Sequence, residues 1–534
     1  MRISSRTFFI FMDKLTDSVL RLAFGVILVR VISKEMYGDF RLVLMIGTLF
    51  SSLSNFGLTE SLYYFLASKS PSQRKKPFSC IICLGLLTSG LASACMFYYA
   101  VPVSAHFNNP KIVDALRIFS LAPPIGLLRL LLSNSLIATD RPVLSTEINF
   151  CSTVIRLLAV IIGFSSGHSI EYVIKIYIII EAMSAAALFI ACLFSGQFGG
   201  LTKPELSYIL EIFIYALPLT YGFAVSVAGK FMDKFLISSY FSSSQFAEYV
   251  NGAQDLPFIG MITVSISTAI LPNLVKSARE GDYDSLCRLF SEAMRRSSLI
   301  LLPIFGWAVI VSKDIIVVLY GTDYLRSWYP FLVYLFVLPV RVVLYSSILR
   351  AIGKTKALVW SPTIALLTNI SIGFVFVRVF GNSLLGFIGP AIGHVISIYL
   401  SAAITSKLLK RELNKLGYYG KIFNFKDYFT ILFSVVLSGV ITFFLTSLPL
   451  QSILPCNLSH FSKVFPNSGL DAIAIVPLLR IGFGFLVMFI SFYCMGLFTG
   501  AIKRKDLDMI KSLCYRIFHI KRKIISPEKN MADI

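Results

Sequence analysis

Apolar runs, each long enough to cross a bilayer, follow one another along almost the whole chain. Counting runs of about 20 mainly apolar residues as membrane-spanning helices predicts fourteen spans. They cover residues 8–32, 41–67, 78–101, 113–138, 143–164, 170–195, 209–238, 246–272, 294–312, 328–350, 357–379, 384–406, 428–449 and 476–501. The pattern therefore predicts an all-α polytopic membrane protein with about 14 transmembrane helices and no separate soluble domain.

Composition agrees with this class of protein. Hydrophobic residues make up 56% of the 534 positions and charged residues only 14%, with a mean hydropathy of +0.77. The net charge of +21 would suggest a nucleic-acid partner for a soluble protein, but in a membrane protein the position of the charges indicates topology instead. Most of the nine cysteines lie inside apolar runs, so no disulfide framework is indicated.

Basic residues are distributed unequally over the two sides of the predicted spans. With the N-terminus inside, the inner segments hold thirty-one Lys and Arg, and the outer segments hold five. Because cytoplasmic loops carry the excess of Lys and Arg, we expect both termini in the cytoplasm. Thirteen further Lys and Arg lie within the spans or at their edges, which is unusual for membrane helices.

The first predicted span carries charges of both signs. Asp17 and Arg21 share one helix face with Asp13 and Lys14, whereas Arg30 lies on the opposite side near the end of the span. Each charge near the middle of a bilayer costs roughly 3 kcal/mol, so such residues are expected to face protein or a wet cavity. The polar face predicts a functional cavity, and the alternative is local neutralisation of Asp17 by Lys14 and Arg21.

Other spans contain charges whose partners decide where a site can form. Arg129 and Arg341 each lie in the middle of a span with no acid within one helical turn. Each must therefore find a partner on another helix or bind an anion. In the span at 209–238, Asp233 is close to Lys230 and Lys234, and these three can form a local charge-balanced group.

A weak internal repeat relates the two halves of the chain. At an offset of 209, Arg21 falls on Lys230, and the turn at residues 37–38 falls on residues 246–247. Transporters are often built from repeated halves with the site between them. We therefore expect a six-helix N-lobe at 1–202, a six-helix C-lobe at 203–410, two further helices at 411–502 and a basic tail at 503–534.

The expected tail is apolar on one side and basic on the other. This pattern is typical of an amphipathic helix that lies on the anionic inner leaflet of the membrane. Ordinary juxtamembrane charge is the alternative interpretation.

Motifs that would indicate enzymatic or metal chemistry lack the context that they need. A G-x-S-x-G pattern at 163–167 lies in a turn between two predicted membrane helices, whereas a nucleophile elbow requires a strand before the serine. Gly353-Lys354-Thr355 resembles the end of a phosphate-binding loop, but Ile348 stands where the first glycine would be. The five histidines lack metal-ligand spacing, so we expect no catalytic residue, no metal site and no nucleotide cofactor.

The segment 29–67, VRVISKEMYGDFRLVLMIGTLFSSLSNFGLTESLYYFLA, resembles the opening of the Wzx-type polysaccharide flippases of the multidrug/oligosaccharidyl-lipid/polysaccharide exporter superfamily. The positions that carry this resemblance are Arg30, Glu35, Tyr37, Gly38, Asn55, Gly57 and Leu58. Residues 302–335 are similar to the family's pattern for its ninth and tenth helices, and AIGKTK at 351–356 is similar to its cytoplasmic turn before helix 11. The similarity spans most of residues 8–408.

The resemblance implies a two-lobed bundle that opens alternately to either side of the bacterial inner membrane. It implies export of an undecaprenyl-diphosphate-linked oligosaccharide for a surface polysaccharide, such as the O-antigen of lipopolysaccharide. The expected partners are this lipid-linked oligosaccharide, anionic inner-leaflet lipids and the polysaccharide polymerase machinery.

Charge-assisted contacts are a suitable way to hold a lipid diphosphate at membrane depth. The residues that we expect to contact the diphosphate or acidic sugars are Arg21, Arg129, Lys230 and Arg341. Asp17 and Asp233 would balance these charges and titrate with a coupling H⁺ or Na⁺, with no other cofactor. We expect Arg30, Tyr37, Gly38 and Gly57 to have motif or structural roles.

Two other functions remain open from the sequence. A drug or metabolite exporter of the same superfamily is the nearest, although cationic drugs favour acidic or apolar cavities and the unpaired intramembrane charges here are arginines. A membrane glycan polymerase or ligase is the second. Its chemistry calls for a large outer loop with paired carboxylates, and the longest outer segment, 450–475, has 26 residues and no such pair.

Overall fold

A computed structural model describes residues 18–66, 70–139, 141–195, 202–256, 259–342, 345–354, 357–447, 472–503 and 506. Residues 18–31 are helical. The other helices up to residue 194 are α2 (Lys34–Ser54), α3 (Leu58–Leu66), α4 (Pro71–Tyr98), α5 (Ala100–His106), η1 (Pro110–Ile112), α6 (Val113–Phe119), α7 (Ala122–Ala138), α8 (Pro142–Ser165) and α9 (Ile170–Phe194). We call residues 18–195 the first half.

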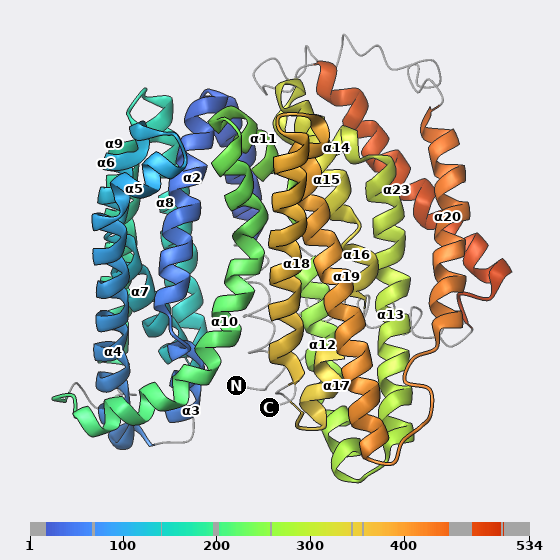
Figure 1. The fold of residues 1–534 in the computed structure, drawn as a ribbon, viewed down its shortest axis with the longest axis horizontal. Helices are drawn as coiled ribbons and strands as arrows, with labels where there is room; N and C mark the ends of the chain where they lie inside the picture. The colour runs from blue at the N-terminus through green and yellow to red at the C-terminus, as the bar shows by residue number, and fades with distance from the viewer. Residues whose placement is uncertain are drawn as a thin grey trace, which may run out of the picture.

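The remaining helices, the second half, begin at residue 206. They are α10 (Leu206–Tyr240), α11 (Ser243–Gly252), α12 (Ile259–Arg279), α13 (Tyr283–Ile310), α14 (Ser312–Tyr320), η2 (Thr322–Ser327), α15 (Trp328–Leu335), α16 (Leu338–Arg341), α17 (Tyr345–Ala351), α18 (Ala357–Phe380), α19 (Leu384–Lys415), α20 (Phe425–Ser447) and α23 (Ala472–Thr499). Figure 1 shows the two halves side by side, with α10 between them.

Ten helices of the described residues are long and apolar enough to cross a membrane. An eleventh span is obtained if the two segments of α10, Leu206–Leu217 and Leu219–Tyr240, which are bent by 49°, count as one. The structure therefore confirms an all-helical multi-pass membrane protein. The expected span at 8–32 lies partly outside the described residues.

Several expected spans are broken rather than continuous, among them 41–67 between α2 and α3 and 113–138 between α6 and α7. The span at 328–350 divides into α15, α16 and α17, and Pro339 stands in the first turn of α16, where it cannot donate a backbone hydrogen bond to the turn before it. The span at 246–272 divides into α11 and α12, because the chain leaves the helix after Gly252. Apolar composition alone predicted the runs but not their interruptions.

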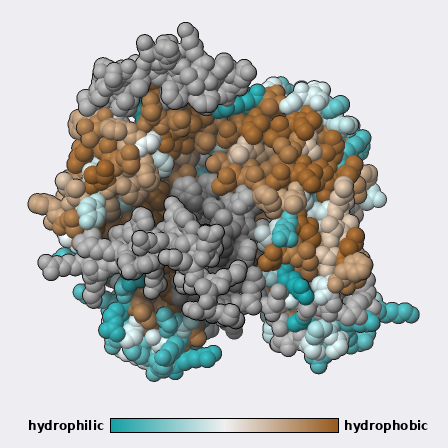
Figure 2. Space-filling model, turned by 180° about the vertical axis from the view of Figure 1, so that it is seen from behind, coloured by the Kyte–Doolittle hydropathy of each residue, from teal (hydrophilic) through white to brown (hydrophobic). Residues whose placement is uncertain are grey.

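The apolar core shows how the two halves meet. Toward the end where α2 begins, one continuous core includes Phe40 and Phe164 of the first half and Phe246 and Leu301 of the second half. Toward the opposite end there are two separate cores. One joins the first half to the start of α10 and includes Phe78 and Ile212, and the other lies within the second half between α12, α13 and α19. Apart from the start of α10, which packs on the first half, the halves are therefore joined at the α2 end, and Figure 2 shows a gap between them at the lower edge of the molecule.

Gly57 forms the break between α2 and α3. It has φ 66°, a left-handed conformation that favours glycine. A Cβ atom at this position would lie 2.9 Å from the Ala216 carbonyl oxygen of α10. Both the backbone conformation and the close approach of α10 therefore require glycine here, which gives this motif residue a structural role.

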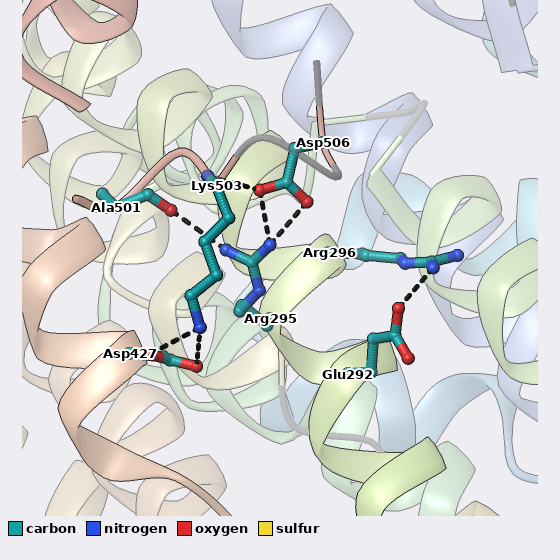
Figure 3. Close-up of polar contacts among 7 residues, drawn as sticks. All are labelled: Glu292, Arg295, Arg296, Asp427, Ala501, Lys503 and Asp506. Carbon is teal, nitrogen blue, oxygen red and sulfur yellow. Dashed lines mark hydrogen bonds and ion pairs between the residues drawn. The ribbon is translucent and has the colours of Figure 1, made fainter. Parts of the chain in front are cut away.

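The chain after α23 turns back and is fixed to α13 and α20 (Figure 3). Arg295 of α13 is buried and donates to both carboxylate oxygens of Asp506 at 2.5 Å and to the Ala501 carbonyl at 3.0 Å. Lys503 Nζ lies 3.0 Å from the carboxylate of Asp427 at the start of α20. These contacts hold the last described residues against the second half.

We expect Asp506→Ala to lower the thermal stability of the protein strongly, because Arg295 would remain buried and unpaired. Loss of one partner of a buried ion pair costs about 3–5 kcal/mol. Glu292→Ala is a matched control, since it breaks the neighbouring but solvent-exposed pair Glu292–Arg296, and exposed pairs contribute about 0–1 kcal/mol. Thermal unfolding of both variants in detergent measures the difference, and equal unfolding temperatures would contradict the importance of the buried pair.

Candidate functional site

A cavity of about 1130 Å³ lies between the two halves. The first half contributes the helix at 18–31 and α2, and the second half contributes α10, the segment 253–255, α16, α18 and α19. Because both halves supply walls, a change in their relative position would change access to this central cavity.

The lining of the central cavity is strongly basic. The Lys and Arg residues among the described lining residues are Arg21, Arg41, Lys230, Lys234 and Arg341. The one acidic side chain among these described lining residues is Asp255. A cleft lined with one sign of charge concentrates ligands of the opposite sign, so the cavity suits an anion.

Arg41 and Lys230 are the lining cations with the fewest polar contacts. Among the residues that the structure describes, neither lies within ion-pair distance of a carboxylate. Arg41 packs over the Tyr37 ring at 5.8 Å, and Lys230 packs over the Phe231 ring at 5.9 Å. Both charges are therefore available to a ligand in the cavity.

Arg341 has a partner that the sequence did not indicate. Its Nη2 donates to Asp255 Oδ2 at 2.5 Å, and both side chains keep contact with the cavity. Asp255 lies in the break between α11 and α12, within the expected span 246–272. The sequence predicts one continuous helix over this stretch and gives no sign that Asp255 meets another helix.

The sequence predicted that Asp17 and Asp233 balance the charge of the cavity cations, and the structure describes only Asp233. Asp233 is fully buried behind the cavity wall, where it accepts hydrogen bonds from Tyr334 and from Tyr249, the latter at 3.0 Å, with Lys234 at 3.3 Å. Asp17, the other residue expected to balance charge or couple to an ion, lies outside the described residues. Arg21 itself lines the cavity.

Arg129 lies apart from the central cavity, which corrects its expected position beside Arg21 and Lys230. In α7 it donates to Glu181 Oε1 of α9 at 2.6 Å and to Asn149 Oδ1 of α8 at 2.7 Å. Glu181 also pairs with the buried Arg156 of α8. The sequence left two alternatives for Arg129, a partner on another helix or a bound anion. The structure shows the first, because packing of α7, α8 and α9 brings Glu181 to Arg129.

The Arg-Tyr-Gly motif lies at the α2 end of the cavity. Arg30 donates to the Val318 carbonyl at 3.0 Å. Tyr37 is buried and donates to Asn251 Oδ1 at 2.7 Å. A Cβ atom on Gly38 would lie 2.0 Å from the Ser243 carbonyl oxygen, so glycine is required for the close approach of α2 and α11.

Three polar side chains in the cavity wall each have a buried atom without a hydrogen-bond partner among the described residues. They are Asn251 Nδ2, Asn369 Oδ1 and His394 Nδ1. Buried polar groups are nearly always hydrogen-bonded. Each of these atoms is shielded from the cavity, so it can meet a polar group of a ligand only if the wall rearranges. The sequence offered no signal for them, because none belongs to a motif with fixed spacing.

An apolar groove of about 420 Å³ runs between α13 and α20. Its walls include Phe305, Ile310, Val435 and Phe443. Within the described residues, no group of three or more His, Cys, Asp or Glu side chains could hold a metal ion. The candidate site is therefore the basic cavity between the halves, and the second half also carries an apolar groove.

The fold and the cavity define a multi-pass helical membrane protein with a basic chamber between two halves. The sequence pattern of the family described as "Polysaccharide biosynthesis protein" matches residues 27–328, and the chain belongs to this family. This match confirms the resemblance that residues 29–67 indicated. No curated protein sequence matches the chain.

Solved structures share the fold at low sequence identity. The lipid II flippase MurJ in an inward closed conformation is 16% identical, with a TM-score of 0.67 over 92% of this chain and 98% of that chain. An inward-facing multidrug resistance MATE family transporter of the MOP superfamily is 11% identical, with a TM-score of 0.57 over 77% and 100%. A MOP superfamily transporter from Pyrococcus furiosus is 11% identical, with a TM-score of 0.52 over 76% and 94%. The chain therefore has the fold of the MOP superfamily.

Proposed function

We propose that the protein is a flippase that moves an undecaprenyl-diphosphate-linked oligosaccharide from the inner to the outer leaflet of the bacterial inner membrane. The exported unit would serve surface polysaccharide biosynthesis, such as assembly of O-antigen. The observation that carries the proposal is the basic cavity between the two halves of a polysaccharide biosynthesis family member. MurJ, which shares the fold, is named a lipid II flippase.

The cavity chemistry fits a diphosphate. Arg41 and Lys230, which have no carboxylate partner among the described residues, would contact the phosphate oxygens first. Arg21 and Arg341 would add charge-assisted hydrogen bonds, with Arg341 exchanging Asp255 for phosphate. The buried Asp233 would balance the cluster, and a coupling H⁺ or Na⁺ would act there.

The dimensions of the two hollows fit the two parts of a lipid-linked sugar. The central cavity, at about 1130 Å³, lies at or above the upper size of small-molecule sites, roughly 300–1,000 Å³, and has room for a diphosphate with sugar units. The apolar groove between α13 and α20 would hold part of the polyprenyl tail, since its walls are almost entirely hydrocarbon. The head would then cross within protein while the tail stays in lipid.

The proposal includes the complete topology. Besides the eleven spans that length and hydropathy support, we count the first helix, the α11–α12 pair and the α15–α17 series as crossings, which makes fourteen. Lobes at 1–202 and 203–410, two helices at 411–502 and a basic tail at 503–534 on anionic lipids complete the arrangement. The excess of basic residues supports a topology with both termini in the cytoplasm, and the α2 end of the cavity would then face outward.

Binding of short polyprenyl probes to the purified protein tests the function. We expect affinity to fall from farnesyl diphosphate to farnesyl monophosphate to farnesol, because each step removes negative charge from the basic cavity. Added salt should weaken diphosphate binding more than farnesol binding. Equal affinity for the three probes, or tighter binding of a cationic dye, would contradict the proposal and favour a drug exporter.

A further inference from the structure

The two halves are joined at the α2 end by polar contacts around Glu248 of α11. Glu248 is buried and accepts from Lys34 Nζ of α2 at 3.0 Å, with Arg326 of η2 at 3.9 Å. One turn along each helix, Tyr37 donates to Asn251. The first turn of α2 is therefore fixed to α11 by an ion pair and a hydrogen bond.

A second set of contacts surrounds Asp39 on the first half. Asp39 is buried and accepts from Asn109 Nδ2 at 2.6 Å. The same Asn109 amide lies 3.2 Å from Ser243 Oγ at the start of α11. Asn109 thus bridges a buried acid of one half to the first residue of α11 in the other.

These two sets are related by the internal repeat. At the offset of 209, the N-cap Ser33 of α2 falls on Ser242, the N-cap of α11, and each serine accepts a hydrogen bond from the backbone three residues later. Asp39 falls on Glu248, so each half contributes one buried acid to the contact. The first turns of two equivalent helices therefore meet at the α2 end.

Two further contacts between the halves also start from positions related by the offset of 209. Arg30 reaches from the first half to the Val318 carbonyl of the second. Ser239, which falls on Arg30 at the same offset, lies 3.0 Å from His106 Nε2 of the first half. Each half thus reaches across to the other from the equivalent position, although the residue types differ.

We infer that Lys34, Tyr37, Asp39, Asn109, Glu248 and Asn251, the outer latch, hold the cavity closed at the α2 end and must separate for cargo to leave there. This inference rests on the proposed function and gives a conformational role to the motif residues Tyr37 and Gly38. The latch is polar and Lys34 is one-third exposed, so water can replace its hydrogen bonds when the halves part. A purely apolar contact would offer no such replacement.

Charge reversal at Lys34 and Glu248 tests the latch without any substrate. The readout is labelling of Ser226→Cys, in the cavity wall, by a membrane-impermeant maleimide in a background without other reactive cysteines. We expect Lys34→Glu and Glu248→Lys each to raise labelling from the outer face severalfold, because two like charges would face each other. The double reversal is made together with Arg326→Gln, because Arg326 also faces residue 248. It restores the pair and should return labelling toward that of the parent.

Lys111→Glu is the matched control, since it reverses an exposed lysine that pairs with Glu35 inside the first half. Labelling that is unchanged in both single reversals, or that stays raised in the double reversal, would overturn the latch. If either single reversal fails to fold, a reversible cross-link between Lys34→Cys and Glu248→Cys replaces it. The cross-linked protein should bind farnesyl diphosphate but not transport, and transport that survives complete cross-linking would equally overturn the latch.

The failure of the latch and the failure of the proposed function are distinguishable. Absence of diphosphate binding by the parent protein would reject the flippase assignment, whatever the labelling result. If the parent binds the diphosphate normally and charge reversal at Lys34 or Glu248 leaves the labelling unchanged, the latch alone is rejected.

Discussion

Simultaneous replacement of Arg41 and Lys230 by alanine is expected to abolish export of the lipid-linked oligosaccharide. These cations line the central cavity and have no carboxylate partner among the described residues, so their charge is available to the cargo. A hydrogen bond to a charged group contributes about 1.5–3 kcal/mol, so each single variant should lose about tenfold or more in transport and the pair about a hundredfold or more. Surface polysaccharide per cell, at matched protein levels in the membrane, is the measurement.

Lys230→Arg is the matched control for this prediction, because it keeps the positive charge at the same place in α10. We expect it to retain most of the activity. Full export by the double alanine variant would contradict the assignment of the cavity to an anionic cargo. Loss of export in Lys230→Arg alone would show that size rather than charge is recognised.

The second large effect is expected on stability, from Glu181→Gln. Glu181 is buried and pairs with both Arg129 and Arg156, so neutralising it leaves two cations at membrane depth with no compensating charge. Breaking a buried ion pair costs about 3–5 kcal/mol, and here one carboxylate serves two arginines. We expect a large drop in unfolding temperature and in the yield of folded protein.

Glu147→Gln is the control for Glu181→Gln, because Glu147 is an exposed acid on α8. It should leave the unfolding temperature unchanged. A Glu181→Gln protein with normal stability but without export would contradict a structural role for the network and return Arg129 to the set of cargo-binding residues.

The helical fold was predictable because the apolar runs are long and well separated. The repeat at offset 209 was also visible, and it relates the N-caps Ser33 and Ser242 as well as the cavity residues Arg21 and Lys230. The breaks inside spans were not predictable from apolar content, since Gly252 and Pro339 change the backbone without lowering the hydropathy of the run enough to end it.

The charged residues also differ in how far the sequence could predict their partners. Of the expected local group around Asp233, the structure brings Lys234 within 3.3 Å of the carboxylate, whereas Lys230 pairs with no carboxylate of the described residues. Glu181 and Asp255 could not be identified as partners of Arg129 and Arg341, since these pairs depend on how helices pack. The sequence predicts Arg41 at the edge of the span 41–67, yet α2 begins at Lys34, so Arg41 lies inside the helix and lines the cavity.

Reconstituted proteoliposomes test the central claim most directly. A lipid-linked oligosaccharide is placed in one leaflet, and its appearance in the other is followed with a membrane-impermeant glycosidase. We predict that the protein accelerates transfer well above that in protein-free vesicles and that the variant with both Arg41→Ala and Lys230→Ala does not. Transfer at the protein-free rate with the unaltered protein, or at the full rate with the double variant, would contradict the account.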